Sequence, residues 1–177
     1  GTKTIQHYLQ DWVNQTPNKE ALIDPANKSS LCNTPSYTLT YKELQHKIDQ
    51  VATVLHEQRI GKGDIVILQL PNIVELVISY FAVLKIGAIS SPFPVQYREF
   101  ECLQLLQSLQ AKAVITMQKI NDRQYANMYT QLQSQVPSLK TIFTFDGATE
   151  NVISIDLQKQ QDMPLPIVHV TANNIFT

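Results

Sequence analysis

The chain has 177 residues, of which 44% are hydrophobic and 16% charged, and its net charge is −1. This composition is typical of a globular domain with a buried core and excludes an intrinsically disordered chain. The 14 basic and 15 acidic residues form no basic stripe, so we expect no nucleic-acid partner.

The first 36 residues are predicted to form a lead segment. Apolar residues at helical spacing predict a helix over residues 5–13, and residues 21–24 are a candidate short strand. The segment 25–36 carries Pro, Asn, Ser and Lys, a composition that predicts an exposed loop. Residues 37–39 are then expected to form a strand that leads directly into a helix.

The helix after this strand has a clear start signal. Thr40 is well placed as its N-cap residue, and Glu43 stands three residues later, which completes a capping box. One apolar stripe follows at helical spacing, which predicts an amphipathic helix. The stripe consists of Leu44, Ile48, Val51, Ala52 and Leu55. Gly61 and Gly63 are expected to end this helix and turn the chain.

Strands and helices alternate through the rest of the predicted core. The expected order is strand 64–70, helix 73–86 with Asn72 as its cap, strand 88–93, helix 98–109, strand 112–116, helix 125–135 and strand 141–145. This alternation predicts βαβ units, and hence an α/β fold with a mostly parallel sheet flanked by helices. We therefore divide the chain into the lead segment 1–36, a βαβ core over 37–146 and an irregular tail over 147–177, with a possible short strand at 152–155.

The long apolar stretch over residues 73–93 resembles a membrane span in hydropathy alone. It contains Glu75 and Lys85, however, and Gly87 and Pro92 interrupt it. A membrane span of about 20 residues rarely tolerates such residues. We expect a buried helix followed by a buried strand, and no membrane-spanning segment.

Direct inspection finds no catalytic constellation. The sequence lacks GxGxxG, GxxxxGK[ST] and GxSxG motifs. Its histidines are scattered without the spacing of metal ligands; they are His7, His46, His56 and His169. We expect no metal site and no catalytic residue, and from chemistry alone the sequence predicts an α/β domain of unknown function.

The cysteines and carboxylates also form no recognisable catalytic or metal-binding motif. Cys32 and Cys102 stand far apart and outside any CxxC cluster, so neither a zinc site nor a disulfide framework is expected. The reducing cytoplasm is then the expected location, and Cys102 is expected to be a buried structural residue.

Glu99 and Glu101 are two residues apart on a predicted helix and should face different ways. For Glu75, on a buried helix, a satisfied hydrogen-bonding role is expected rather than catalysis.

Four short pieces of sequence carry a family resemblance. They are residues 39–44 (LTYKEL), residues 70–72 (LPN), residues 84–88 (LKIGA) followed by Pro92, and residues 111–115 (AKAVI). In this order and spacing they resemble the adenylate-forming superfamily of acyl-CoA synthetases, aryl-acid ligases, luciferases and peptide-synthetase adenylation domains. Each piece alone is explained as a cap, a turn or a core strand.

The resemblance implies that the chain is the N-terminal part of the large domain of a longer ligase. Such a parent would convert a carboxylic acid and ATP, with Mg²⁺, to an acyl- or aryl-adenylate, and then to a thioester of CoA or a carrier protein. Residues 171–177 resemble the turn and strand that, in relatives, lead into a Gly/Ser/Thr-rich phosphate loop. Because that loop supplies backbone N–H groups and a lysine to the triphosphate, we expect this chain alone to bind no cofactor and to be inactive.

The resemblance also narrows the subfamily. Amino-acid-activating domains tend to have P-[LI]-D where this chain has Pro92, Phe93 and Pro94; residues 94–101 look more like aryl-acid–AMP ligases and short- or medium-chain acyl-CoA ligases. Some CoA ligases use a basic residue in this loop near the nucleotide phosphate of CoA. Arg98 is therefore the candidate contact for the CoA phosphate, and the alternative is a solvated charge at a helix N-terminus.

Two other hypotheses remain open from the sequence. The chain could be a free-standing α/β binding module that lost the ATP site, or an unrelated doubly wound protein such as a flavodoxin-like regulator. The strand-end turns of the latter would hold a ligand, but here they show no acidic cluster or glycine-rich loop. If the chain is part of a ligase, apolar surface should be exposed and favour self-association, most of all from the helix 73–86 and the final strand.

Overall fold

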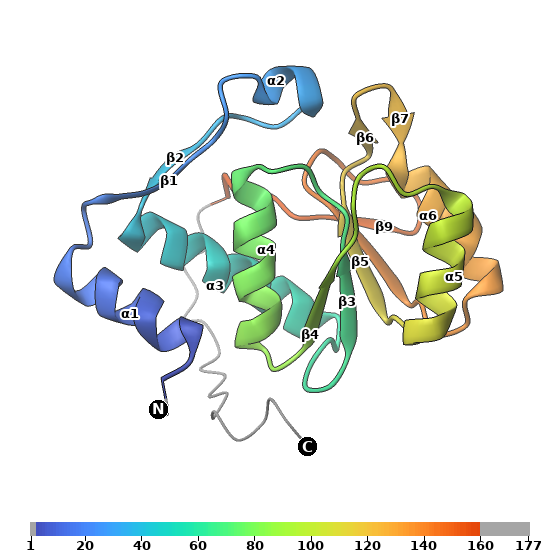
Figure 1. The fold of residues 1–177 in the computed structure, drawn as a ribbon, viewed down its shortest axis with the longest axis horizontal. Helices are drawn as coiled ribbons and strands as arrows, with labels where there is room; N and C mark the ends of the chain where they lie inside the picture. The colour runs from blue at the N-terminus through green and yellow to red at the C-terminus, as the bar shows by residue number, and fades with distance from the viewer. Residues whose placement is uncertain (1–2, 160–177) are drawn as a thin grey trace.

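The predicted strands and helices occur in the predicted order, and the structure adds a short helix at 28–31 and a hairpin at 119–124. The computed structural model describes residues 3–159 (Figure 1). Its elements are α1 (Ile5–Gln15), β1 (Glu20–Ile23), α2 (Lys28–Leu31), β2 (Thr38–Thr40), α3 (Tyr41–Glu57), β3 (Ile65–Leu68), α4 (Val74–Lys85), β4 (Ile89–Pro92), α5 (Glu99–Leu109), β5 (Ala113–Thr116), β6 (Lys119–Ile120), β7 (Arg123–Gln124), α6 (Tyr125–Leu132), a 3-10 turn (Gln133–Gln135), β8 (Thr141–Thr144) and β9 (Val152–Ser154).

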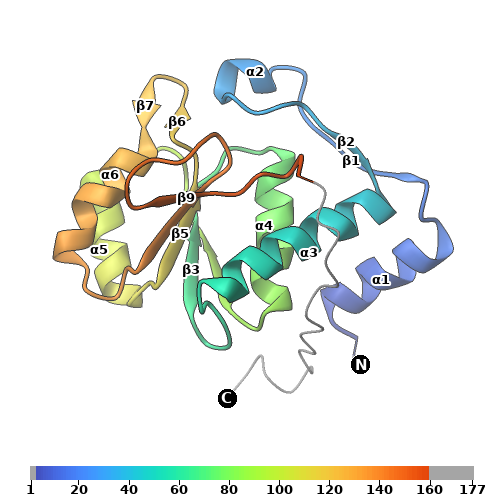
Figure 2. The same ribbon diagram turned by 180° about the vertical axis from the view of Figure 1, so that it is seen from behind.

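A five-stranded parallel sheet forms the centre of the molecule, with the order β4-β3-β5-β8-β9. Helices α3 and α4 lie on one side of the sheet, and α5 and α6 on the other (Figures 1 and 2). The α/β fold with a parallel sheet is thus confirmed. The chain runs from β3 to β4 on one side and then crosses to β5 on the other. The connection after β3 leads to β4, and the connection after β4 leads back across β3 to β5. The strand order therefore reverses at β3, and the carboxyl ends of the strands there form a topological switch point.

The exposure of the strands follows their place in the sheet. The side chains of β5 are all buried, and three of the four in β3 are as well, as a near-continuous apolar run predicts. The prediction of a buried strand at 88–93 was wrong, because β4 is an edge strand and Ile89 is 51% exposed. Pro92 fits this position, since proline has no N–H to donate to a further strand.

The N-terminus of α3 has the predicted capping box. The backbone N–H of Glu43 donates to the Thr40 hydroxyl over 3.3 Å, and the backbone N–H of Thr40 donates to Glu43 Oε2 over 2.8 Å. These bonds satisfy backbone donors that a helix start leaves unpaired. The apolar stripe of the helix is buried against the core, as predicted.

This capping box gives a pH-dependent contribution to stability. Donation from the backbone N–H and then the hydroxyl of Thr40 lowers the pKa of Glu43 below its ordinary value of 4.5. A lowered pKa means that the contribution is present above the ordinary value and is lost as pH falls through the folded-state pKa. We expect Glu43→Gln to lower the free energy of unfolding at pH 7 by only about 0.5 kcal/mol, because the site is exposed.

Urea denaturation of the wild-type chain and of Glu43→Gln at pH 7 and at pH 3 measures this effect. The difference in their free energies of unfolding should shrink at the lower pH. Glu150→Gln, an exposed replacement before β9, should show no such change. An undiminished difference at pH 3 would count against the capping role.

The segment 25–36 is the clearest correction to the sequence prediction. It is not a simple exposed loop, because it contains α2 and buries both Lys28 and Cys32. The Lys28 ammonium donates to Asp24 Oδ2 over 2.7 Å, to both Glu75 oxygens over 2.8 Å, and to the Pro35 carbonyl over 2.7 Å. A lysine is almost never buried without such partners.

Asp24 ties the same segment to the start of α4. Its Oδ1 accepts the backbone N–H of Val74 and its Oδ2 accepts that of Tyr37, each over 2.8 Å. The prediction that Asn72 caps this helix was therefore wrong, since Ile73 is the N-cap residue and has no side-chain cap bond. The hydrogen-bonding role expected for Glu75 is confirmed by its two bonds from Lys28.

Two of the family-like pieces serve the scaffold through their lysines. Lys85, in α4, pairs with Asp49 of α3. Lys112, just before β5, donates to the Arg59 carbonyl over 2.7 Å and to Asp64 Oδ2 over 2.8 Å. The Lys85 pair joins α4 to α3, and the Lys112 bonds join the amino end of β5 to that of its neighbour β3.

The tail returns to α3 after β9, which is the strand predicted at 152–155. The Lys47 ammonium donates to the Leu157 carbonyl over 2.6 Å, and the Gln50 side chain donates to the Lys159 carbonyl. The turn and strand expected at 171–177 lie outside the described residues. No helix within residues 3–159 is both long and apolar enough to cross a membrane.

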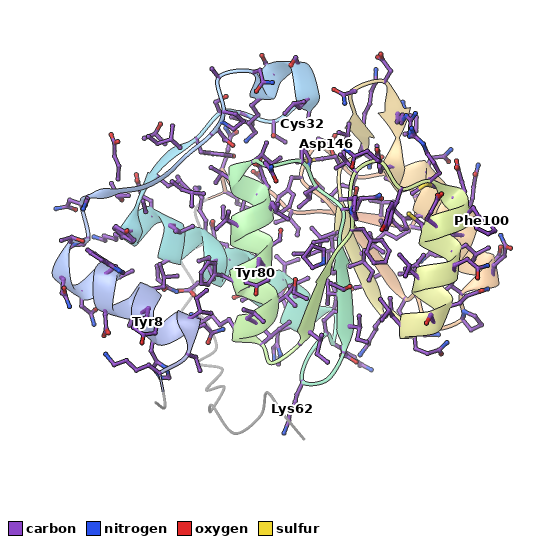
Figure 3. The ribbon with its side chains drawn as sticks, in the orientation of Figure 1. Tyr8, Cys32, Lys62, Tyr80, Phe100 and Asp146 are labelled. Atoms are coloured by element: carbon purple, nitrogen blue, oxygen red, sulfur yellow. The ribbon has the colours of Figure 1, made fainter. Side chains whose placement is uncertain are left out.

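Large exposed apolar side chains lie on α1, β1, β4 and α5. In the described part of the chain, the large exposed ones are Ile5, Tyr8, Trp12, Ile23, Ile89 and Phe100; Figure 3 labels Tyr8 on α1 and Phe100 on α5. None of them belongs to α4, where Leu76, Tyr80 and Phe81 are partly buried against the core, and the final strand lies outside the described residues. Self-association itself stays a prediction.

Candidate functional site

A cavity lies between the start of α5, β7 and α6. Its volume is about 390 Å³, within the range of small-molecule pockets of about 300–1,000 Å³. Its lining residues are Tyr97, Arg98, Glu99, Arg123, Gln124, Tyr125, Asn127, Met128 and Gln131. These residues follow the carboxyl ends of β4 and β5, so the cavity lies at the edge where parallel α/β sheets place their ligands.

Arg98, the candidate from the sequence, lines this cavity from the N-cap position of α5. Its backbone N–H donates to Glu101 Oε2 over 3.0 Å, which leaves its exposed side chain to face the cavity. The backbone N–H groups of Glu101 and Arg98 lower the pKa of the Glu101 carboxyl. Glu99 lines the same cavity and Glu101 does not, in agreement with the prediction that the two face different ways.

Arg123, which the sequence analysis missed, also lines the cavity. It belongs to β7, in the hairpin that follows β5. Across residues 3–159, neither Arg98 nor Arg123 forms a salt bridge. The chain has only three arginines, and a signal was available: two of them follow strands whose carboxyl ends meet at one edge of the sheet.

A buried polar network holds the loop that precedes Arg98. Gln69, just after β3, donates from Nε2 to the Pro94 carbonyl over 2.8 Å and accepts the Tyr129 hydroxyl at Oε1 over 2.7 Å. Tyr125 donates its hydroxyl to the Val95 carbonyl. Burial raises the pKa of Tyr129 and that of Tyr125, so both remain neutral donors. The network ties the loop after β4 to α6 and to the residue that follows β3.

The other residues singled out from the sequence do not assemble into a site. Cys102 is buried beside Tyr129 and Gln69, as expected of a structural cysteine, and burial raises the pKa of its thiol. The three described histidines are exposed on α1 and α3, and His169 lies outside the described residues. Within residues 3–159, no group of three or more His, Cys, Asp or Glu residues is arranged to hold a metal ion.

The sequence matches the AMP-binding enzyme family over residues 9–177. The chain belongs to this family. It is 28% identical over 159 residues to a medium-chain fatty-acid–CoA ligase of Escherichia coli K12, covering 90% of this chain and 26% of the relative. It is 30% identical over 185 residues to a crotonobetaine/carnitine–CoA ligase of Escherichia coli O17:K52:H18, covering 97% of this chain and 34% of the relative.

Solved structures of AMP-binding enzymes share the fold. An acetoacetyl-CoA synthetase from Streptomyces lividans superposes with a TM-score of 0.78 at 17% identity, covering 96% of this chain and 26% of that one. The chain of 177 residues therefore spans about a quarter to a third of the length of these relatives. The hypothesis of an unrelated doubly wound protein is excluded by the family match.

Proposed function

We propose that the chain is the N-terminal part of a longer ATP-dependent ligase that activates a carboxylic acid. The observation that carries this proposal is the family match over residues 9–177, which spans the parallel sheet and the cavity at its carboxyl edge. Relatives named as acid–CoA ligases support the reaction class.

The proposed reaction has two steps. A carboxylate oxygen of the acid attacks the α-phosphorus of ATP, the bond from this phosphorus to the oxygen that bridges it to the β-phosphate breaks, and pyrophosphate leaves. A bound Mg²⁺ would neutralise the charge that develops on the phosphates. The thiolate of CoA or a carrier protein then attacks the acyl carbonyl of the adenylate, and AMP leaves. The residues that bind ATP and the acid are proposed to belong to other parts of the ligase, so that the 177-residue chain alone is inactive. The short span relative to the relatives supports this division.

The contribution proposed for this part of the ligase is to bind the acceptor, and this proposal replaces the expectation from the sequence that the chain alone binds no cofactor. CoA carries a phosphate on its adenosine, and Arg98 and Arg123 both line one cavity. Guanidinium groups suit phosphate because they offer paired N–H donors and a permanent charge. A carrier protein presents its thiol without this nucleotide phosphate, so the arginine pair favours CoA as the acceptor.

The cysteines bear on where the ligase works. Cys32 and Cys102 are both buried and free, which is the usual state of cysteines in a reducing compartment. This supports a cytoplasmic location as part of the proposal.

The alternative of a free-standing binding module predicts a different gene. If the chain is part of a ligase, the native gene should encode a Ser/Thr/Gly-rich loop ending in Pro-Lys within about ten codons after Thr177, since backbone N–H groups of such a loop cradle phosphates. A stop codon directly after Thr177 would overturn the ligase proposal and support the binding module. Sequencing the native locus gives the answer.

A further inference from the structure

The hairpin that carries Arg123 cannot hold its position by itself. Strands β6 and β7 have two residues each, and their pairing is Lys119 with Gln124 and Ile120 with Arg123. An isolated two-stranded hairpin is at best marginally stable in water. Contacts with other parts of the molecule must therefore fix the place of Arg123 at the cavity.

Asp146 fastens the base of this hairpin. It lies directly after β8, and its Oδ1 accepts the backbone N–H of Gln118 over 2.6 Å while Oδ2 accepts that of Lys119 over 3.2 Å. The Gln118 side chain donates in return to the Gly147 carbonyl over 2.9 Å. Figure 3 labels Asp146 at the same end of the molecule as the hairpin.

The carboxylate of Asp146 is used for backbone donors and not for a cation. No salt bridge to Asp146 occurs among residues 3–159. Bonds from N–H groups to an ionised carboxylate are about twice as strong as bonds between neutral groups. At the far end of the hairpin, the N–H of Asn121 donates to the Leu31 carbonyl of α2 over 2.8 Å. Arg123 thus stands between two anchored ends.

We propose that Asp146 is a positioning residue for the nucleotide phosphate of CoA. It does not line the cavity, so it acts through the hairpin, by holding Arg123 at the cavity that Arg98 also lines. This inference rests on the proposed function, because it assumes that the arginine pair binds the CoA phosphate. It assigns to the turn after β8 a part in choosing between CoA and acceptors that lack the phosphate.

The test compares the affinities of the 177-residue chain for CoA and for 3′-dephospho-CoA by calorimetric titration. Asp146→Asn replaces one acceptor oxygen with an NH₂ group that faces a backbone N–H, which should release the base of the hairpin. We expect the affinity for CoA to fall about tenfold, the equivalent of one charge-assisted bond, and the affinity for dephospho-CoA to stay unchanged. If Asp146→Asn fails to fold, Asp146→Glu takes its place. It keeps the charge but displaces the hairpin, and it should also weaken CoA binding.

Asp122→Asn is the matched control. Asp122 is exposed in the turn of the same hairpin and pairs with the Lys119 ammonium over 3.7 Å. Its replacement makes the same change in net charge and leaves the backbone bonds to Asp146 in place. We expect it to leave both affinities unchanged. An equal loss of CoA affinity in Asp122→Asn would show that net charge, and not position, is responsible, and would overturn the inference.

A double-mutant cycle separates positioning from a general structural role. In an Arg123→Gln background, Asp146→Asn should have no further effect on CoA affinity, because the group that it positions is gone. Additive losses, or an Arg123→Gln effect without any Asp146→Asn effect, would overturn this inference alone. Equal affinities of the wild-type chain for the two ligands, or absence of CoA binding, would overturn the acceptor proposal and this inference with it.

Discussion

Replacing Lys28 with methionine is expected to lower the free energy of unfolding by about 3–5 kcal/mol, the cost of breaking a buried ion pair by removing one partner. The side chains of Lys28 and Glu75 are fully buried and that of Asp24 is 1% exposed. The variant would leave two carboxylates in the interior without their cation. It would also weaken the attachment of α2 to α4, since the ammonium joins Asp24, Glu75 and the Pro35 carbonyl, and only the bond from the Val74 N–H to Asp24 would remain of these links. Chemical denaturation followed by circular dichroism measures the change.

Two variants make this prediction specific. Lys42→Met removes an exposed lysine from α3 and should change the free energy of unfolding by no more than about 0.5 kcal/mol. Lys28→Met combined with Glu75→Leu should recover part of the loss, because buried ion pairs can be replaced by apolar residues at little cost. A loss below about 1 kcal/mol in Lys28→Met, the range of exposed ion pairs, would contradict the buried cluster.

Arg98→Gln and Arg123→Gln are each expected to weaken CoA binding about tenfold or more, because a hydrogen bond to a charged group contributes about 1.5–3 kcal/mol. Dephospho-CoA should bind these variants as it binds the wild-type chain, since it lacks the phosphate. Calorimetric titration of both ligands measures the two affinities. Arg59→Gln is the matched control, because Arg59 is the third arginine and does not line the cavity. If Arg59→Gln weakens CoA binding as much as the other two, the cavity is not the phosphate site.

The parts of the fold that the sequence predicted correctly depend on local signals. The capping box at Thr40 and Glu43 spans three residues, and the alternation of apolar strands with helices repeats within each βαβ unit. These patterns suffice for the α/β fold and the parallel sheet. The placement of β4 at the edge depends on which strands pair across the sheet, and the residues of β4 alone do not reveal it.

The errors concern partners that are distant in the sequence. Lys28 pairs with Glu75, 47 residues away, and Asp24 caps α4 from 50 residues away. A polar composition indicates solvent exposure for a loop, but it carries no information on such a buried carboxylate partner. The loop prediction for residues 25–36 and the Asn72 cap failed for this reason.

The sequence predicted one of the two arginines of the candidate site, Arg98, and missed the other, Arg123. Arg98 was singled out because its loop resembles that of CoA ligases, and the structure places it at a cavity. Arg123 has no motif of its own and reaches the same cavity because β4 and β5 are parallel neighbours of β3. Gln69 holds the loop before Arg98, and Asp146 holds the hairpin of Arg123. Both bind backbone groups, and no sequence pattern predicts such contacts.

The central claim is that this chain belongs to a ligase that forms an acyl- or aryl-adenylate. Acid-dependent exchange of labelled pyrophosphate into ATP, catalysed by the protein from the complete native gene, tests it most directly. We expect exchange with at least one member of a panel of short-chain, medium-chain and aryl acids, none without an acid, and none with the 177-residue chain alone. A folded full-length protein that shows no exchange with any of these acids would contradict the claim.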